Sequence, residues 1–132
     1  MIVVFDLDNT LSDEFGSAAR PGIAELLGKL RADGHTLILW TNSKRDRARL
    51  ILYELRLLRS FDSFLFREDY DLEEEGARKD LRCVNGDFIV DDDPAEVEFA
   101  RSIGKDGFCI TPFRKGRSPG IEELDRIYAA IG

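Results

Sequence analysis

Short apolar runs alternate with amphipathic segments along the whole chain. The runs are rich in β-branched and aromatic residues and lack polar alternation, a pattern typical of parallel strands that are buried on both faces. They predict strands over residues 2–5, 36–40, 63–66, 88–90 and 107–110.

The segments between these runs have apolar residues at helical spacing. Pro21 and Pro94 stand where a first helical turn accepts proline, and Gly34 follows the last apolar position of its segment. Helices are predicted over residues 21–34, 43–58, 93–103 and 121–131. Because strands and helices alternate, we expect an α/β protein with a doubly wound, three-layer, Rossmann-like fold around a parallel sheet of about five strands.

Composition narrows the class further. A chain of 132 residues with 43% hydrophobic content suits one domain, residues 1–132, with one core. The net charge of −7 leaves no bulk attraction for nucleic acid, although a local basic patch stays open. The apolar N-terminal run is too short for a signal peptide or a membrane span, so we expect no membrane partner and a cytoplasmic location.

The two cysteines, Cys83 and Cys109, are far apart and belong to no metal-binding spacing. We expect both to be small buried hydrophobes in a reducing compartment.

Polar residues follow the apolar runs at the expected strand ends. Asp6 and Asp8 follow the first run, Thr41 the second, and Asp91 with Asp92 the fourth. In open α/β sheets the carboxyl ends of the strands meet at one crevice, so these side chains should converge there. Four carboxylates together need a cation or raised pKa values, and ligands that are all oxygen suit Mg²⁺, the first candidate for that cation.

These residues resemble the four ordered motifs of the haloacid dehalogenase superfamily. The motifs are "DLDNT" at 6–10, "LILWT" at 37–41, Lys79, and "IVDDD" at 89–93. Within that superfamily the chain is most similar to the RNA polymerase II C-terminal-domain phosphatases and their NLI-interacting-factor-like relatives. That likeness spans most of the chain and rests on "RPG" at 20–22, "LWTNS" at 39–43, "LFRE" at 65–68, "KDL" at 79–81 and "VDDDP" at 90–94.

The resemblance implies catalytic roles. Asp6 would be the nucleophile that becomes an aspartyl phosphate, and Asp8 would be the general acid and base. Thr41 and the backbone N–H of Asn42 would hold phosphate oxygens, and Lys79 would neutralise charge.

Metal and substrate contacts are implied in the same way. Mg²⁺ would be bound by Asp6, by Asp92 and by the backbone carbonyl of Asp8, with Asp91 supporting the site from beside it. Arg20 and Arg67 are candidate substrate contacts, and each could equally be an ordinary surface ion-pair partner.

The spacing of the motifs leaves no room for a cap domain. Dehalogenases of the superfamily lack the second aspartate, and a mutase needs its intermediate shielded from water, so a phosphate-ester hydrolase is favoured. An open, capless site suits a large or protruding phosphorylated substrate such as a phosphoprotein. The segment 12–19 is shorter than the peptide-gripping insertion of the polymerase-tail phosphatases, so a polynucleotide 3'-phosphatase and a small-metabolite phosphatase remain alternatives.

A non-enzymatic alternative is a signalling module that binds phosphate and magnesium. The order of acidic residues differs from that of receiver domains, and Asp6, Asp8 and Lys79 are all present, which favours an enzyme. The sequence leaves open whether the protein is a monomer or a small homo-oligomer.

Three charged segments have mainly a solvation role in this interpretation. The acidic stretch 68–75 and the basic stretch 114–120 read as exposed loops. The basic residues of the helix after Thr41 read as its polar face, with the steering of an anionic substrate as the alternative.

Overall fold

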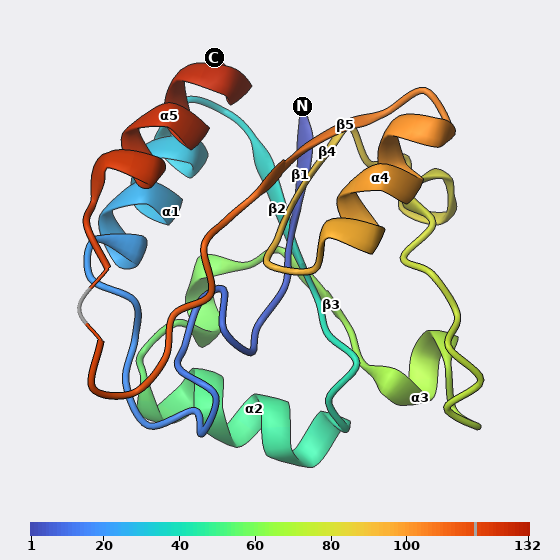
Figure 1. The fold of residues 1–132 in the computed structure, drawn as a ribbon, viewed down its shortest axis with the longest axis horizontal. Coiled ribbons are helices and arrows are strands. Elements are labelled where there is room, and N and C mark those ends of the chain that lie inside the picture. The colour runs from blue at the N-terminus through green and yellow to red at the C-terminus, as the bar shows by residue number, and fades with distance from the viewer. Residues whose placement is uncertain (118) are drawn as a thin grey trace.

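A five-stranded parallel sheet in the order β3-β2-β1-β4-β5 forms the centre of the fold (Figure 1). The computed structural model describes residues 1–117 and 119–132; Ser118, in the basic stretch 114–120, lies outside the described residues. The strands are β1 (Ile2–Phe5), β2 (Thr36–Trp40), β3 (Ser63–Leu65), β4 (Phe88–Asp91) and β5 (Asp106–Cys109). The predicted α/β fold with about five parallel strands is confirmed.

Helices cover both faces of this sheet. In Figure 1, α1 and α5 lie side by side over one face, α4 lies over the other, and α2 lies beyond the strand ends. The helices are α1 (Ile23–Ala32), α2 (Arg45–Glu54), α3 (Arg67–Tyr70), α4 (Pro94–Ser102) and α5 (Glu122–Ile131), with 3₁₀ turns at Leu58–Ser60 and Leu81–Val84. Helix α2 ends earlier than predicted, and Arg56 just beyond it has a left-handed φ of 60°.

Alternate residues of the strands face two separate cores. Val3 and Phe5 of β1 belong to the larger core, which includes the apolar faces of α1, α2 and α5. Val4 and, from β2, Trp40 belong to the smaller core, which α4 covers through Val97. Burial on both faces explains why the strand sequences lack polar alternation.

The order in which strands are added to the sheet changes direction at β1. Strands β2 and β3 continue to one side of it, and β4 and β5 continue to the other. Such a switch point leaves a crevice outside the carboxyl ends of the strands, and Asp6 stands there as the residue after β1.

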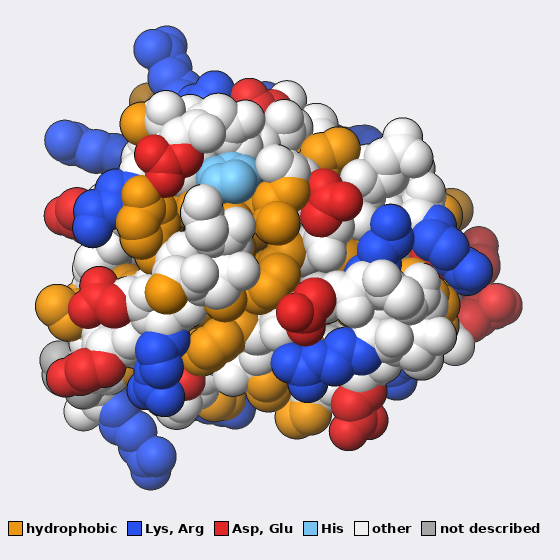
Figure 2. Space-filling view, turned by 90° about the horizontal axis from the view of Figure 1, so that it is seen from above, with side chains coloured by type: hydrophobic (Ala, Val, Ile, Leu, Met, Phe, Trp, Pro, Cys, Tyr) orange, Lys and Arg blue, Asp and Glu red, His pale blue; other side chains and the backbone are white. Residues whose placement is uncertain are grey.

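The opposite end of the molecule, where the strands begin, has a different character. Figure 2 shows this end, where hydrophobic side chains form a band between separate acidic and basic groups. No helix among residues 1–117 and 119–132 combines the length and the apolar character needed to cross a membrane.

The cysteines correct one expectation. Cys83 and Cys109 are both exposed, not buried. Cys83 lies in the 3₁₀ turn before β4, and Cys109 ends the edge strand β5, so neither position faces a core.

Candidate active site

A cavity of about 780 Å³ lies at the carboxyl ends of the strands. Its lining includes most of the residues that the sequence singles out, namely Asp6, Asp8, Thr41, Asn42, Arg67, Lys79, Asp91 and Asp92. Asp6 and Asp8 come from the loop after β1, Thr41 and Asn42 from the end of β2, and Asp91 and Asp92 from the end of β4. The topology therefore brings together residues that are up to 86 positions apart, from Asp6 to Asp92.

Lys79 is the centre of this arrangement. Its Nζ donates to Asp6 Oδ1 at 2.9 Å and to Asp91 Oδ2 at 2.8 Å, and its residue is only 4% exposed. Burial alone lowers the pKa of Lys79, but the charges of Asp6 and Asp91 outweigh it and raise the pKa above the ordinary value. The ammonium group therefore stays charged and offsets the repulsion between the two carboxylates.

The carboxylates themselves are unusual. Burial raises the pKa of Asp6 to about 6, against the attraction of Lys79. Burial and the charge of Asp6 likewise raise the pKa of Asp91 to about 6. Burial also raises the pKa of Asp92. A further cation nearby would therefore stabilise the charged forms of these three carboxylates at neutral pH.

The carboxylate oxygens of this site are suitable ligands for such a cation. Carboxylate oxygens of Asp6, Asp91 and Asp92 all lie within 4.8 Å of one another. Asp91 accepts from Lys79 at Oδ2 and from the N–H of Asp93 at Oδ1, and Asp6 accepts from Lys79 at Oδ1, so Asp92 is the most available metal ligand of the three. Oxygen-only donors of this kind suit a hard divalent ion such as Mg²⁺.

Thr10 links two of these three carboxylates. Its Oγ1 lies 3.2 Å from Asp6 Oδ2 and 3.2 Å from Asp92 Oδ1, and the residue is fully buried. Thr10 also forms the turn after β1, where its N–H donates to the carbonyl of Leu7 at 3.2 Å. In the structure its hydroxyl also bridges β1 and β4 at the acidic cluster.

Asp8 points to a different partner. Its Oδ1 accepts from Arg47 Nη2 at 2.9 Å and its Oδ2 accepts from Arg47 Nη1 at 3.1 Å. Arg47 lies on α2 and also donates from Nη1 to Ser43 Oγ at 2.8 Å. Because both side chains are partly exposed, this pair contributes at most about 1 kcal/mol to stability.

The end of β2 forms another wall of the cavity. Thr41 is 1% exposed, and its Oγ1 accepts the N–H of Ser43 at 3.0 Å, which shapes the turn into α2. Arg67 donates from Nε to the carbonyl of Asn42 at 2.8 Å and pairs with Glu74 at 3.0 Å. Arg67 thus faces the cavity while bracing the loop that carries Asn42.

Arg20 has a structural position instead. It is 2% exposed, and its guanidinium donates to the backbone carbonyls of Thr10, Asn9 and Thr111. Arg20 is not among the described residues that line the cavity. It fastens the loop after β1 to the segment after β5, which keeps the turn at Asp8 and Thr10 in place.

Sequence reasoning missed three buried acids, of which Glu96 and Asp71 lie at or beside the cavity lining. Glu96 of α4 lines the cavity, and its Oε1 accepts the N–H of Lys79 at 3.2 Å. Asp71 accepts N–H groups of Glu75, Gly76 and Ala77, so the acidic stretch is an ordered turn and not a simple solvated loop. An acidic residue inside an acidic run, or in the first turn of a helix, carries no sequence signal for such a role.

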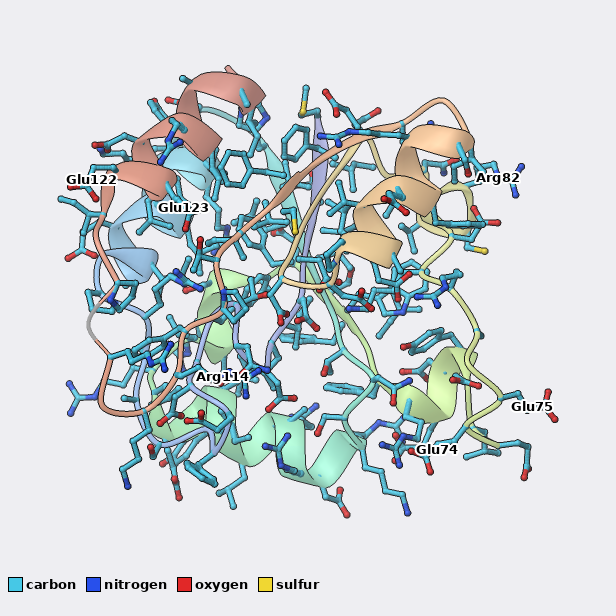
Figure 3. All side chains as sticks on the ribbon, viewed as in Figure 1. Glu74, Glu75, Arg82, Arg114, Glu122 and Glu123 are labelled. Carbon is cyan, nitrogen blue, oxygen red and sulfur yellow. The ribbon has the colours of Figure 1, made fainter. Side chains whose placement is uncertain are left out.

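The basic loop after β5 contacts the edge of this site through Glu14 but does not itself line the cavity within the described residues. Arg114 pairs with Glu14 at 3.9 Å, and the N–H of Lys115 donates to the same carboxylate at 2.7 Å. Figure 3 shows Arg114 on this loop, and it shows Glu74 and Glu75 on the loop after α3. Neither Arg114 nor Lys115 is among the described residues that line the cavity.

Solved structures share this fold. A β-phosphoglucomutase candidate from Thermotoga maritima aligns with a TM-score of 0.71 at 15% identity, covering 98% of this chain and 97% of that chain. A haloacid dehalogenase-superfamily hydrolase from Ehrlichia chaffeensis aligns with a TM-score of 0.66 at 14% identity, covering 98% and 97%. A hydrolase from Streptococcus pneumoniae TIGR4 aligns with a TM-score of 0.68 at 13% identity, covering 85% and 93%.

The fold is shared with a haloacid dehalogenase-superfamily hydrolase, and the acidic strand ends and the buried lysine line one cavity of it. The model of the NLI interacting factor-like phosphatase family matches residues 1–129, and the chain belongs to that family. It is therefore a phosphatase, and its substrate is phosphorylated. No curated protein sequence matches the chain.

Substitution of Lys79 tests the electrostatic account. Lys79→Met leaves Asp6 and Asp91 buried without their cation, so the free energy of unfolding in urea should fall by about 3–5 kcal/mol at pH 7.5. Lys29→Met, at an exposed lysine of α1 that lies over the ring of Tyr128, is the control and should change it by no more than about 1 kcal/mol. Equal stabilities of the two variants would contradict the account.

Substitution of Arg20 separates a structural role from a substrate contact. Arg20→Met removes the donors of three backbone carbonyls, so we expect a loss of about 3 kcal/mol or more in urea unfolding. A variant with unchanged stability and a raised KM would instead restore Arg20 as a substrate contact.

The raised pKa values of Asp6 and Asp91 predict a pH-dependent response to metal. In the metal-free protein their protonation stabilises the fold fully below about pH 4, and this stabilisation is lost as the pH rises through about 6. MgCl₂ added to EDTA-treated protein should therefore raise Tm more at pH 7.5 than at pH 5.5. Differential scanning calorimetry measures Tm at both pH values, and equal increases in Tm would contradict this prediction.

Proposed function

We propose that the protein is a magnesium-dependent phosphatase that hydrolyses a phosphate monoester through an aspartyl phosphate at Asp6. The observation that carries this proposal is the Lys79 ammonium group between Asp6 and Asp91, 2.9 Å and 2.8 Å away, with Asp92 beside them. This arrangement supports a charged nucleophile next to oxygen donors for a metal, which is what phosphoryl transfer requires.

In the first step a carboxylate oxygen of Asp6 attacks phosphorus. The bond between phosphorus and the ester oxygen breaks, and Asp8 gives its proton to the departing oxygen. Lys79 and the groups at Thr41 and Asn42 would stabilise the charge that develops on the phosphoryl oxygens.

In the second step water attacks the phosphorus of the aspartyl phosphate. Asp8, now a carboxylate, takes a proton from that water, and inorganic phosphate leaves as the Asp6 carboxylate is restored. One residue thus gives a proton in the first step and takes one in the second, so the cycle closes without net change in the protein.

Asp6 and Asp92 would hold the magnesium ion with the backbone carbonyl of Asp8, and Asp91 would support them. The ion would neutralise phosphoryl charge and orient the phosphate for in-line attack. Thr10, which lies 3.2 Å from both Asp6 and Asp92, keeps these two donors in register.

The substrate favoured by this site is a phosphate on a large or protruding partner, such as a phosphoprotein. The loop from 6 to 22 is held by isolated bridges at Ser12 and adds no cap over the cavity within the described residues. We propose that residues 1–132 act as one phosphatase domain in the cytoplasm, as a monomer or a small homo-oligomer. A 3'-phosphorylated polynucleotide and a small metabolite are the alternative substrates.

Hydrolysis of p-nitrophenyl phosphate tests the mechanism. The purified protein should release nitrophenol with MgCl₂ and stop on addition of EDTA. Asp6→Asn and Asp8→Asn should each lower kcat by about 10³-fold or more, because one lacks the nucleophile and the other the base that takes a proton from water in the second step. Asp125→Asn, at an exposed site on α5, is the control, and full activity in Asp6→Asn would refute the mechanism.

A further inference from the structure

We propose that Arg47 determines substrate specificity by binding a carboxylate that lies next to the phosphoryl group of the substrate. This inference rests on the proposed phosphatase function and names a feature of its substrate. In the free protein the guanidinium of Arg47 donates two hydrogen bonds to the Asp8 carboxylate, from Nη2 to Oδ1 at 2.9 Å and from Nη1 to Oδ2 at 3.1 Å. Arg47 lines the same cavity as Asp6 and Lys79.

The contact between Arg47 and Asp8 weakens during the reaction. When Asp8 carries the proton that it gives to the departing oxygen, it has no negative charge, and its two contacts with Arg47 are no longer those of an ion pair. The side chains of Arg47 and Asp8 are 45% and 29% exposed, so water can replace the contact at small cost. The guanidinium, still held to Ser43 Oγ at 2.8 Å through Nη1, then has donors available beside the departing oxygen.

Other arginines and the buried lysine of the cavity have partners that the reaction does not need to release. Lys79 bridges two carboxylates, Arg67 holds the carbonyl of Asn42 and pairs with Glu74, and Arg78 lies 3.6 Å from Glu96. Arg47 differs because its carboxylate partner, Asp8, is itself the proposed proton donor; no other carboxylate among the described residues pairs with Arg47. Lys44, one turn earlier on the chain, adds a second positive charge to this wall of the cavity.

The geometry indicates the ligand. The planar fork of Arg47 already fits a carboxylate in two-point contact, and a substrate carboxylate can take the place of the Asp8 carboxylate. Because Asp8 faces the departing oxygen in the proposed mechanism, the substrate carboxylate belongs on the leaving-group side, close to the ester oxygen. A phosphoserine followed by an acidic residue meets this description.

Two blocked dipeptides that differ by one charge test the proposal. Phosphoseryl-aspartate and phosphoseryl-asparagine amides, both acetylated, are titrated calorimetrically into Asp6→Asn protein, which binds without turnover. The aspartate peptide should bind about tenfold more tightly, as one charge-assisted contact provides. Arg47→Gln in the same background should abolish the difference. Arg49→Gln, at an exposed arginine of α2 outside the cavity lining, should retain it.

Equal affinities in the protein with Arg47 intact, no binding of the aspartate peptide, or a preference that survives Arg47→Gln would each overturn the proposal. Should Asp6→Asn fail to fold, the same titrations are made with Asp6 retained and metal removed by EDTA. Binding is measured without catalysis, so an inactive protein on p-nitrophenyl phosphate would count against the proposed function and leave the Arg47 result readable.

Discussion

The convergence of carboxylates at the carboxyl ends of β1 and β4 is the constraint on which the site depends. Asp6, Asp91 and Asp92 bring like charges within 4.8 Å of one another, with Asp6 and Asp91 buried and Asp92 partly buried. Lys79 offsets part of this repulsion with two short contacts, but burial, together with the neighbouring carboxylates, still raises the pKa values of Asp6 and Asp91. This cost of the charged carboxylates is the physical reason for proposing a divalent cation at the site.

Much of the fold and of the site could be predicted from the sequence. Strands β1 and β2 were predicted to the residue because their apolar runs end at polar side chains, Asp6 and Thr41. The rule that parallel strands share one functional edge then placed Asp6, Thr41 and Asp91 together, as the structure does. Helix α4 begins as predicted because Asp93 caps it through the N–H of Ala95.

The remainder depends on tertiary contacts that local pattern does not encode. Arg20 was indistinguishable from a substrate contact by sequence, and only the meeting of three loop carbonyls shows its structural use. By sequence, Arg47 is one of several basic residues on the polar face of a helix, and only the fold shows that it forms an ion pair with Asp8. Cys83 and Cys109 are exposed because of where a turn and an edge strand lie, which composition does not reveal.

Chemical trapping of the phosphorylated residue tests the central claim that Asp6 is the nucleophile created by this environment. Turnover is quenched with acid, the acyl phosphate is reduced with borohydride, and the position of the resulting homoserine is read by peptide mass spectrometry. The account predicts homoserine at position 6 and at no other aspartate. Phosphate release with Asp6 unmodified, or with homoserine at position 8, 91 or 92, would contradict it.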